Sequence, residues 1–327
     1  MYISLDSRVT DSLSHSRRLV ATLLAALLAV ATLGIGPAAV WAQEGGSADE
    51  EEEIPEPEDL TLVTRDGVIL GATYYGSLEG DEAVPVVCLH GLEGSRNEFS
   101  ELALDLQEQG YAVLTVDLRG HGGSTEVQGS RVKLDPSRLT PQQIQLMVVQ
   151  DLEAVNRFLW KKNNDKELNL NKLCLIGAET GAVVAANYAA RDWSIRNYGA
   201  LQQGRFVKGL VLLSPPLRTK GLDMIHPMQH PALTEQIAAL LLFGELDRSA
   251  RNDAEKIYRR MLDGKSQPKE PRERRVFASG IDTRLQGTKL LDSRLRTARY
   301  ISVFIKLKLA EANGPQFQWK ELKRPHQ

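Results

Sequence analysis

The stretch that most constrains the fold is residues 173–190, with the sequence LCLIGAETGAVVAANYAA. It begins as a short apolar run, as in a buried strand. It ends in a run of small residues, as in a helix that lies close to a sheet. Between the two runs, Gly177 and Gly181 bracket a sharp turn with Glu179 at its centre. A strand that passes directly into a helix in this way predicts a sheet covered by helices.

The same alternation of strands and helices continues along most of the chain. A β-hairpin is expected around Asp66-Gly67. Short apolar strands are predicted at residues 84–91, 111–120, 172–177, 206–217 and 237–247, with a weaker one at 274–280. Apolar residues at helical spacing predict helices at residues 97–110, 142–162, 182–191 and 290–310. Strands that are apolar throughout are typical of parallel sheets, so we expect an α/β fold with a mostly parallel, doubly wound sheet.

The N-terminal region is predicted to lie outside this fold. Residues 1–42 combine a basic flank, an apolar core and small residues up to Ala42, which together are typical of a cleaved secretory signal. The protein is therefore expected to be exported, to the periplasm or the extracellular space. The alternative is an uncleaved membrane anchor formed by residues 19–36.

An acidic segment follows the predicted signal. Residues 43–59 hold nine acidic residues and no basic ones, so a disordered linker is expected there. The folded domain is predicted to span residues 60–315 and to be followed by a C-terminal tail at 316–327. The formal net charge of the whole chain is −2, which does not indicate a nucleic-acid partner.

The two cysteines, Cys88 and Cys174, both lie inside apolar runs. We interpret them as buried thiols that act as small hydrophobic residues. An exported location would permit a disulfide, but two cysteines inside strands indicate one only weakly. The chain shows no ligand spacing typical of a metal site, and we expect no metal or other cofactor.

Two glycine–histidine motifs connect the chain to a known family. His90-Gly91 ends one predicted strand, and residues 117–124, DLRGHGGS, follow the next. In this order, and with the turn at residues 177–181 after them, they resemble the α/β-hydrolase superfamily. The closest resemblance is to its monoacylglycerol-lipase and serine-aminopeptidase-like branch. The resemblance covers roughly residues 60–310 and implies the fold expected above. In lipase-like relatives a cap lies between the two strands that correspond to residues 206–217 and 237–247. Here only about twenty residues separate these strands, which implies a very small cap.

The resemblance also implies where a catalytic site would lie. In this family a nucleophilic serine occupies the centre of the turn at residues 177–181, which we call the elbow turn; here that residue is Glu179. The acid position corresponds to Asp247, and the position of the catalytic histidine corresponds to Gln286. The backbone N–H groups of Leu92 and Thr180 correspond to the donors that hold a developing oxyanion. The nucleophile and the base of the triad are therefore both replaced.

We expect Glu179 to be ionised, because a helix N-terminus favours an anion. Gln286 is expected to donate its amide hydrogens to this carboxylate. His90 and His121 belong to structural loops of the family. His226 and His230 lie in the cap region and would have to reach across the elbow turn to act as a base.

Three hypotheses follow from these replacements. The chain is either a non-catalytic relative that binds a small molecule or a protein, or an altered hydrolase of carboxylesterase or acyl-hydrolase type. The altered hydrolase would use Glu179 covalently, or His226 or His230 as the base. The third hypothesis is an envelope-associated protein that merely retains the fold. Two losses at the two reactive positions favour the first hypothesis, since fold alone does not imply activity.

Overall fold

The computed structural model describes residues 53–324 of the chain. The predicted signal at residues 1–42, and residues 43–52 of the predicted linker, lie outside the described residues. Within residues 53–324, no helix is both long and apolar enough to cross a membrane.

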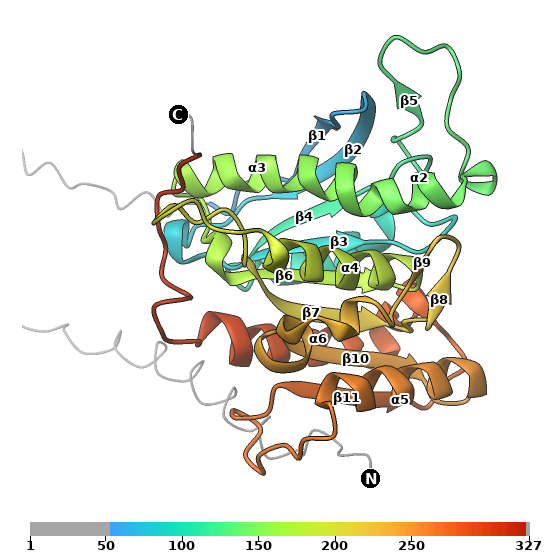
Figure 1. The fold of residues 1–327 in the computed structure, drawn as a ribbon, viewed down its shortest axis with the longest axis vertical. Coiled ribbons are helices and arrows are strands. Elements are labelled where there is room, and N and C mark those ends of the chain that lie inside the picture. The colour runs from blue at the N-terminus through green and yellow to red at the C-terminus, as the bar shows by residue number, and fades with distance from the viewer. Residues whose placement is uncertain (1–52, 325–327) are drawn as a thin grey trace, which may run out of the picture. The chain divides into compact units, whose positions relative to one another are not determined.

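The core of the domain is a mixed sheet whose central part is parallel (Figure 1). The six adjacent strands from Ala112–Val116 to Val276–Ile281 run parallel, and the strand Val68–Tyr75 pairs antiparallel with its two neighbours, Glu58–Val63 and Ala112–Val116. This arrangement confirms the mostly parallel α/β sheet predicted from the apolar strands. In spatial order the strands are β1 (Glu58–Val63), β2 (Val68–Tyr75), β4 (Ala112–Val116), β3 (Pro85–Leu89), β6 (Leu173–Ala178), β7 (Val207–Leu213), β10 (Ala238–Gly244) and β11 (Val276–Ile281), and the short β5 (Glu126–Val127) also pairs with β2.

Helices cover both faces of the sheet, so the doubly wound arrangement is confirmed. One apolar cluster joins one face to α2 (Pro141–Leu146), α3 (Leu152–Asn164), α4 (Thr180–Ser194) and α5 (Arg248–Leu262). A second cluster joins the other face to α1 (Ser100–Gln107) and α6 (Thr297–Ile305). Figure 1 shows α3, α4 and α5 on the near face and α6 behind the sheet. The sheet is thus shielded from water on both faces, as a parallel sheet requires.

The cap between β7 and β10 is small, as expected. It contains a two-stranded ribbon, β8 (Arg218–Thr219) and β9 (Leu222–Asp223), and two short helical turns, Pro227–Gln229 and Ala232–Gln236. Such a cap leaves the carboxyl ends of the parallel strands covered by only a few residues.

The two cysteines are free and fully buried in the neighbouring strands β3 and β6. Cys174 pairs in register with Val86, so Cys88 lies two residues further along the adjacent strand. Burial raises the pKa of both thiols. The interpretation of these residues as buried thiols within the apolar core is therefore confirmed.

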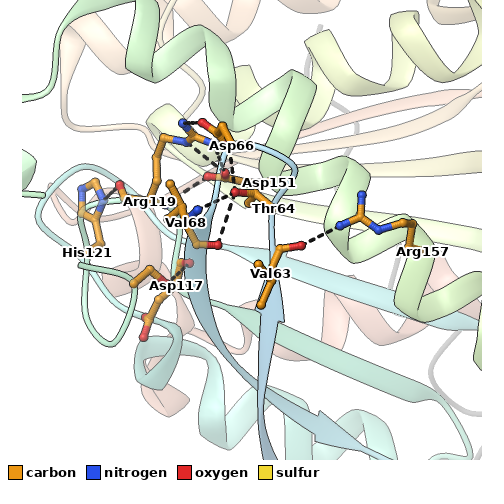
Figure 2. A network of polar contacts seen from close by, with 10 residues as sticks. Val63, Thr64, Asp66, Val68, Asp117, Arg119, His121, Asp151 and Arg157 are labelled. Carbon is orange, nitrogen blue, oxygen red and sulfur yellow. Dashed lines mark hydrogen bonds and ion pairs between the residues drawn. The ribbon is translucent and has the colours of Figure 1, made fainter. Parts of the chain in front are cut away.

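The DLRGHGGS motif stabilises the loop that follows β4. Arg119 is almost fully buried, and its guanidinium donates to Asp151 at 2.7 and 2.9 Å and to Asp66 at 2.8 Å. Figure 2 shows how these three side chains converge. Asp66 lies in the β1–β2 turn, and Asp151 ends a π-helical turn (Met147–Asp151) between α2 and α3. The motif therefore ties three separate segments together rather than contributing reactive groups.

The chain boundaries differ from those predicted in two places. Strand β1 begins at Glu58, inside the predicted linker, because Glu58 and Asp59 pair in register with β2, where Thr73 also donates to the Asp59 carboxylate at 2.6 Å. Residues 316–324, predicted as a tail, contact the domain, and Leu322 among them is only 4% exposed. The folded unit is therefore longer at both ends than the apolar pattern indicated.

Candidate functional site

The elbow turn places Glu179 between the last residue of β6 and the first residue of α4. Its backbone has φ 50° and ψ −112°, a conformation that residues with a side chain rarely adopt. The Glu179 N–H donates to the Leu213 carbonyl at 2.8 Å, which ties the turn to β7. A Cβ atom at Gly181 would lie 2.2 Å from the Leu89 carbonyl oxygen, so only glycine fits there. The tight geometry of the turn is thus present with a carboxylate at its centre.

The Glu179 carboxylate lies against two glycines from distant loops. A Cβ atom at Gly91 would be 2.6 Å from Glu179 Oε2, and one at Gly287 would be 3.0 Å from its carboxyl carbon. Within residues 53–324, the carboxylate has no hydrogen-bond or ion-pair partner. Glu179 is exposed as a whole residue, but partial burial of its carboxylate, and then the charge of Glu98, raise its pKa, while Lys289 acts in the opposite direction. The carboxylate does not cap the helix, and the raised pKa acts against the anion that the helix N-terminus was expected to favour. The ionisation of Glu179 near pH 7 stays a prediction.

Gln286, at the histidine position, is bonded to the ends of two strands instead of to Glu179. Its Oε1 atom accepts from the Ser214 hydroxyl at 2.6 Å and from the Gly244 N–H at 3.2 Å. Its Nε2 atom donates to the carbonyls of Gly244 at 3.1 Å and Arg284 at 3.5 Å. Among the described residues it makes no hydrogen bond to Glu179, so the expected contact between the two side chains is wrong.

Asp247, at the acid position, caps a helix. Its Oδ1 atom accepts from the N–H groups of Ser249 and Ala250, at 2.8 and 3.1 Å, in the first turn of α5. The residue stands beyond the carboxyl end of β10, where the resemblance placed it. Its carboxylate is occupied by the helix, and within the described part of the chain it has no bond to Gln286.

The two expected oxyanion donors, the N–H groups of Leu92 and Thr180, are unpaired. Neither has a hydrogen-bond acceptor among residues 53–324. The Thr180 hydroxyl lies 3.0 Å from the hydroxyl of Thr219 in the cap ribbon, which holds its side chain away from the elbow centre. Thr180 is therefore not placed as a substitute nucleophile.

The buried histidines fulfil structural roles. His90 donates from Nδ1 to the Gly91 carbonyl at 2.6 Å and accepts the Leu118 N–H at Nε2, at 3.0 Å. Burial lowers the pKa of His90 to about 4, so it is neutral near pH 7. His121 lies beside it, with its ring centroid 4.9 Å from that of His90.

The cap histidines are also engaged elsewhere. His226 pairs with Asp223 at 2.8 Å on the surface, and His230 accepts the Ala232 N–H at 3.1 Å. Neither is hydrogen-bonded to Glu179 in the described structure, which leaves the elbow turn without a histidine base. Residues 53–324 also contain no cluster of three or more His, Cys, Asp or Glu side chains that could hold a metal ion.

The sequence comparison identifies the family. Residues 81–267, more than half of the chain, match the model of the family described as serine aminopeptidase, S33. The chain belongs to this family.

The relatives found by sequence comparison match only parts of this chain. An uncharacterised protein of Mycobacterium tuberculosis is 25% identical over 189 residues, which cover 55% of this chain and 59% of that protein. The chain thus spans less than two thirds of that relative. The sn-1-specific diacylglycerol lipase of Mus musculus is 50% identical, but over only 52 residues, 15% of this chain and 17% of the lipase.

Solved structures share the fold of this S33 family member at low sequence identity. The match to an esterase of Pyrococcus furiosus has a TM-score of 0.54 and 17% identity, over 78% of this chain and 91% of that one. The match to a thermostable carboxylesterase cloned from a metagenomic library has a TM-score of 0.55 and 16% identity, over 79% of this chain and 91% of that one. The match to a dienelactone hydrolase of Anabaena variabilis has a TM-score of 0.52 and 17% identity, over 79% of this chain and 100% of that one. These matches confirm the α/β-hydrolase fold.

Two residues near the site of this S33 family member were not singled out from the sequence. Ser214 follows β7 with a positive φ of 48°; besides holding Gln286, its Oγ accepts the Gly287 N–H at 2.9 Å. Glu98 accepts from the Thr288 hydroxyl at 2.9 Å and raises the pKa of Glu179. In the sequence, the only local sign of Ser214 was its place directly before two prolines at the end of a predicted strand. No local pattern marked Glu98.

Proposed function

We propose that this chain is a non-catalytic member of the S33 family that binds a small molecule or a protein. We further propose that it is exported after removal of residues 1–42. Nucleic acid is not among the proposed partners, and association with a membrane is proposed only if residues 19–36 are retained.

The observation that carries the proposal is the absence of a base beside Glu179 in the described structure. An acyl-transfer site needs a group that takes a proton from the nucleophile and returns it to the leaving group. Gln286 cannot do so near neutral pH, and its amide is bonded to Ser214 and Gly244. Asp247 supports α5 instead of a histidine. The removal of triad members typically lowers turnover by several powers of ten.

The proposed ligand site is the crevice at the carboxyl ends of the parallel strands. Open α/β sheets bind ligands at this edge. The unpaired N–H groups of Leu92 and Thr180 and the unpaired Glu179 carboxylate lie there. The small cap leaves the edge accessible, which suits a small molecule or a protruding segment of a protein.

Hydrolysis of p-nitrophenyl acetate tests the absence of catalysis. We expect the purified protein and its Glu179→Ala variant to give the same rate, within two-fold of each other. A wild-type rate about 100-fold or more above that of the variant would refute the proposal.

A matched pair of variants tests whether the crevice still admits an ester. Glu179→Ser alone restores the nucleophile without a base, and Glu179→Ser with Gln286→His restores both. We expect the double variant to exceed the single one by at least about ten-fold, because the elbow turn is intact. Equal rates would contradict the expectation that a nucleophile and a base restored at these two positions act together on an ester.

The raised pKa of Glu179 favours one alternative, an altered hydrolase of carboxylesterase or acyl-hydrolase type that uses this carboxyl group. In such an enzyme the Glu179 carboxylate would attack the ester carbonyl, the bond to the alcohol oxygen would break and the alkoxide would leave, and water would then hydrolyse the acyl anhydride on Glu179. Intact-protein mass spectrometry after incubation with a slowly hydrolysed ester distinguishes the two functions. A stoichiometric adduct that disappears in Glu179→Ala would support the alternative.

The export proposal has its own measurement. Mass spectrometry of the protein from its native host is expected to find an N-terminus at Gln43. An intact N-terminus that retains residues 19–36 would contradict cleavage and support a membrane anchor.

A further inference from the structure

Strand β11 ends the sheet and is paired along only one of its two edges. It comes last in the spatial order of strands, and within residues 53–324 its only partner strand is β10. Figure 1 shows β11 beside β10 at the border of the sheet. Two strands, β7 and β10, separate β11 from β6, whose end leads into the elbow turn. An interaction at this edge is therefore independent of the proposed function.

The backbone groups of β11 alternate between its two edges. The Ala239 N–H donates to the Arg275 carbonyl at 2.9 Å, and the Glu245 N–H donates to the Ile281 carbonyl at 2.8 Å. Odd-numbered residues of β11 therefore direct their N–H and carbonyl groups at β10. Even-numbered residues direct theirs outward, since the direction alternates along a strand.

The outward edge of β11 accepts a peptide-like group at its start and is unpaired beyond it. The Gln267 side chain accepts the Val276 N–H at Oε1 and donates from Nε2 to the Val276 carbonyl, each at 2.8 Å. A residue of an added strand would make the same two bonds. The next outward residues, Ala278 and Gly280, are half-buried, and within residues 53–324 their N–H and carbonyl groups have no partner. An extended chain can therefore add here as a further strand.

The two faces of the sheet beside this edge differ in polarity. Ala278 lies on the α5 side, where it packs with the apolar cluster, as do Tyr258 and Leu262 of α5; all three are only partly buried. Phe277 lies on the opposite face, and Lys308 Nζ is 5.6 Å from its ring centroid. Side chains of an added strand alternate between these two faces. An alternation of apolar and acidic residues therefore fits this edge.

The charge around β11 favours an acidic partner. Residues 248–308 hold 17 lysines and arginines against seven aspartates and glutamates, and the segment 259–275, which leads into β11, holds seven against three. Such a surface attracts an anionic segment, and it opposes pairing with β11 of a second copy, which would bring like charges together. Glu245 lies against Gly280 at the far end of the strand. The acidic residues of the partner are therefore expected nearer its start, beside Lys308.

We propose that the outer edge of β11 binds an extended segment of another protein in which apolar and acidic residues alternate. The backbone of this segment pairs with Ala278 and Gly280 as an added strand. Its apolar side chains contact α5, and its acidic side chains contact Lys308. In strand addition the main-chain bonds supply affinity, and the alternate side chains supply specificity.

The test uses the full chain and a fluorescent seven-residue peptide in which valine and glutamate alternate. Anisotropy measures binding, and nuclear magnetic resonance measures hydrogen exchange of individual N–H groups. With saturating peptide, we expect the N–H groups of Ala278 and Gly280 to exchange at least about ten-fold more slowly than in the free protein. An unchanged anisotropy, or binding that leaves these two N–H groups unprotected, would overturn the proposal.

Peptide variants separate strand addition from simple attraction of charges. A peptide with methylated backbone nitrogens keeps the glutamates but loses its donors, and should bind at least about ten-fold more weakly. A peptide with lysine in place of glutamate keeps the donors and should also bind at least about ten-fold more weakly. Equal binding of the methylated peptide would reduce the contact to charge alone. Equal binding of the lysine peptide would remove the role of charge, and either result contradicts the proposal.

Protein variants test the contact with Lys308. Lys308→Gln removes the ammonium group beside Phe277 and is expected to weaken the glutamate peptide about three- to five-fold. Lys306→Gln is the matched control, since it removes the same charge from an exposed lysine of the same helical turn, Lys306–Ala310. Equal effects of the two variants would refute the placement of the acidic side chains. Protection of Ala278 and Gly280 in the free protein that is lost on dilution would show that a second copy occupies the edge, which also overturns the proposal.

Discussion

Replacement of Glu179 by glycine is expected to stabilise the domain. The residue has φ 50° and ψ −112°, a region that glycine occupies at little cost. Glu179 is exposed as a whole residue, but the surrounding loops partly desolvate its carboxylate and Glu98 repels it, and it has no compensating bond among the described residues. Backbone strain and an unpaired charge therefore coincide at one position, and glycine removes both.

The magnitude follows from the two contributions taken separately. A residue with a Cβ atom in such a strained region costs on the order of 1–3 kcal/mol. Glycine loses about 0.5–1 kcal/mol more than alanine in chain entropy on folding. The difference between Glu179→Gly and Glu179→Ala should therefore be about 1 kcal/mol in favour of glycine. Since alanine keeps the Cβ atom and removes only the carboxylate, it serves as the matched control.

Urea denaturation of the three proteins provides the assay. The midpoint is expected to rise from wild type to alanine to glycine with an unchanged slope, which indicates a change in stability alone. For a domain of this size, about 1 kcal/mol corresponds to roughly 2–4 °C in melting temperature. A glycine variant that is equal to or less stable than the alanine variant would refute the inference of stored strain.

Three further predictions concern charge and capping. Because the folded state raises the pKa of Glu179, ionisation of this residue at pH 7 lowers the stability of the fold. The Glu179→Gln variant should therefore be more stable than wild type at pH 7 and equally stable below about pH 4. A difference in stability that does not change with pH would contradict this reasoning. His90 has a pKa of about 4 in the folded protein against 6.5 as its ordinary value, so the stability present above pH 6.5 should fall by about 3 kcal/mol as pH drops through 4. Nuclear magnetic resonance should find its midpoint near pH 4, and one above pH 6 would exclude this cause. Asp247→Ala should cost about 1 kcal/mol through the lost cap of α5 and leave ester turnover unchanged; a selective loss of turnover would instead give Asp247 a catalytic role.

Much of the fold could be predicted because its signals are local. Strands β3, β6, β7 and β10 are apolar throughout, and such runs are typical of strands buried on both faces of a sheet. The elbow turn was also visible in the sequence, through its glycines at 177 and 181. The structure explains these glycines, because a Cβ atom at either position would clash with backbone atoms. The assignments of Glu179, Asp247 and Gln286 came from the resemblance to the α/β-hydrolase family that these motifs carry.

The contacts of the site could not be predicted because they depend on residues far apart in the sequence. Gln286 faces Ser214, 72 residues earlier, through a backbone turn with positive φ that no local pattern indicates. The expected ionisation of Glu179 considered only the helix that follows it. Its environment is instead set by Gly91, Glu98 and Gly287, from loops on either side of it in the sequence.

The C-terminal boundary was missed for a related reason. Residues 316–324 contain few apolar side chains, and their backbone is held by amides roughly 120–160 positions earlier in the chain. Hydrophobic periodicity cannot detect such a segment, since most of its contacts are polar and it forms neither a helix nor a strand. The asparagines at 163–171 read locally as an ordinary turn-rich connection before β6.

The three triad positions differ in what their side chains now do. Asp247 caps α5, and Gln286 joins the ends of β7 and β10, so both are retained by structural bonds. Glu179 has no such bond within the described residues, and it keeps a strained backbone that contributes nothing to stability by itself. Strain at an unbonded residue persists only when the surrounding structure imposes it. Of the three side chains, Glu179 is therefore the one free to contact a ligand, and a ligand that enters the crevice should be recognised through this carboxyl group.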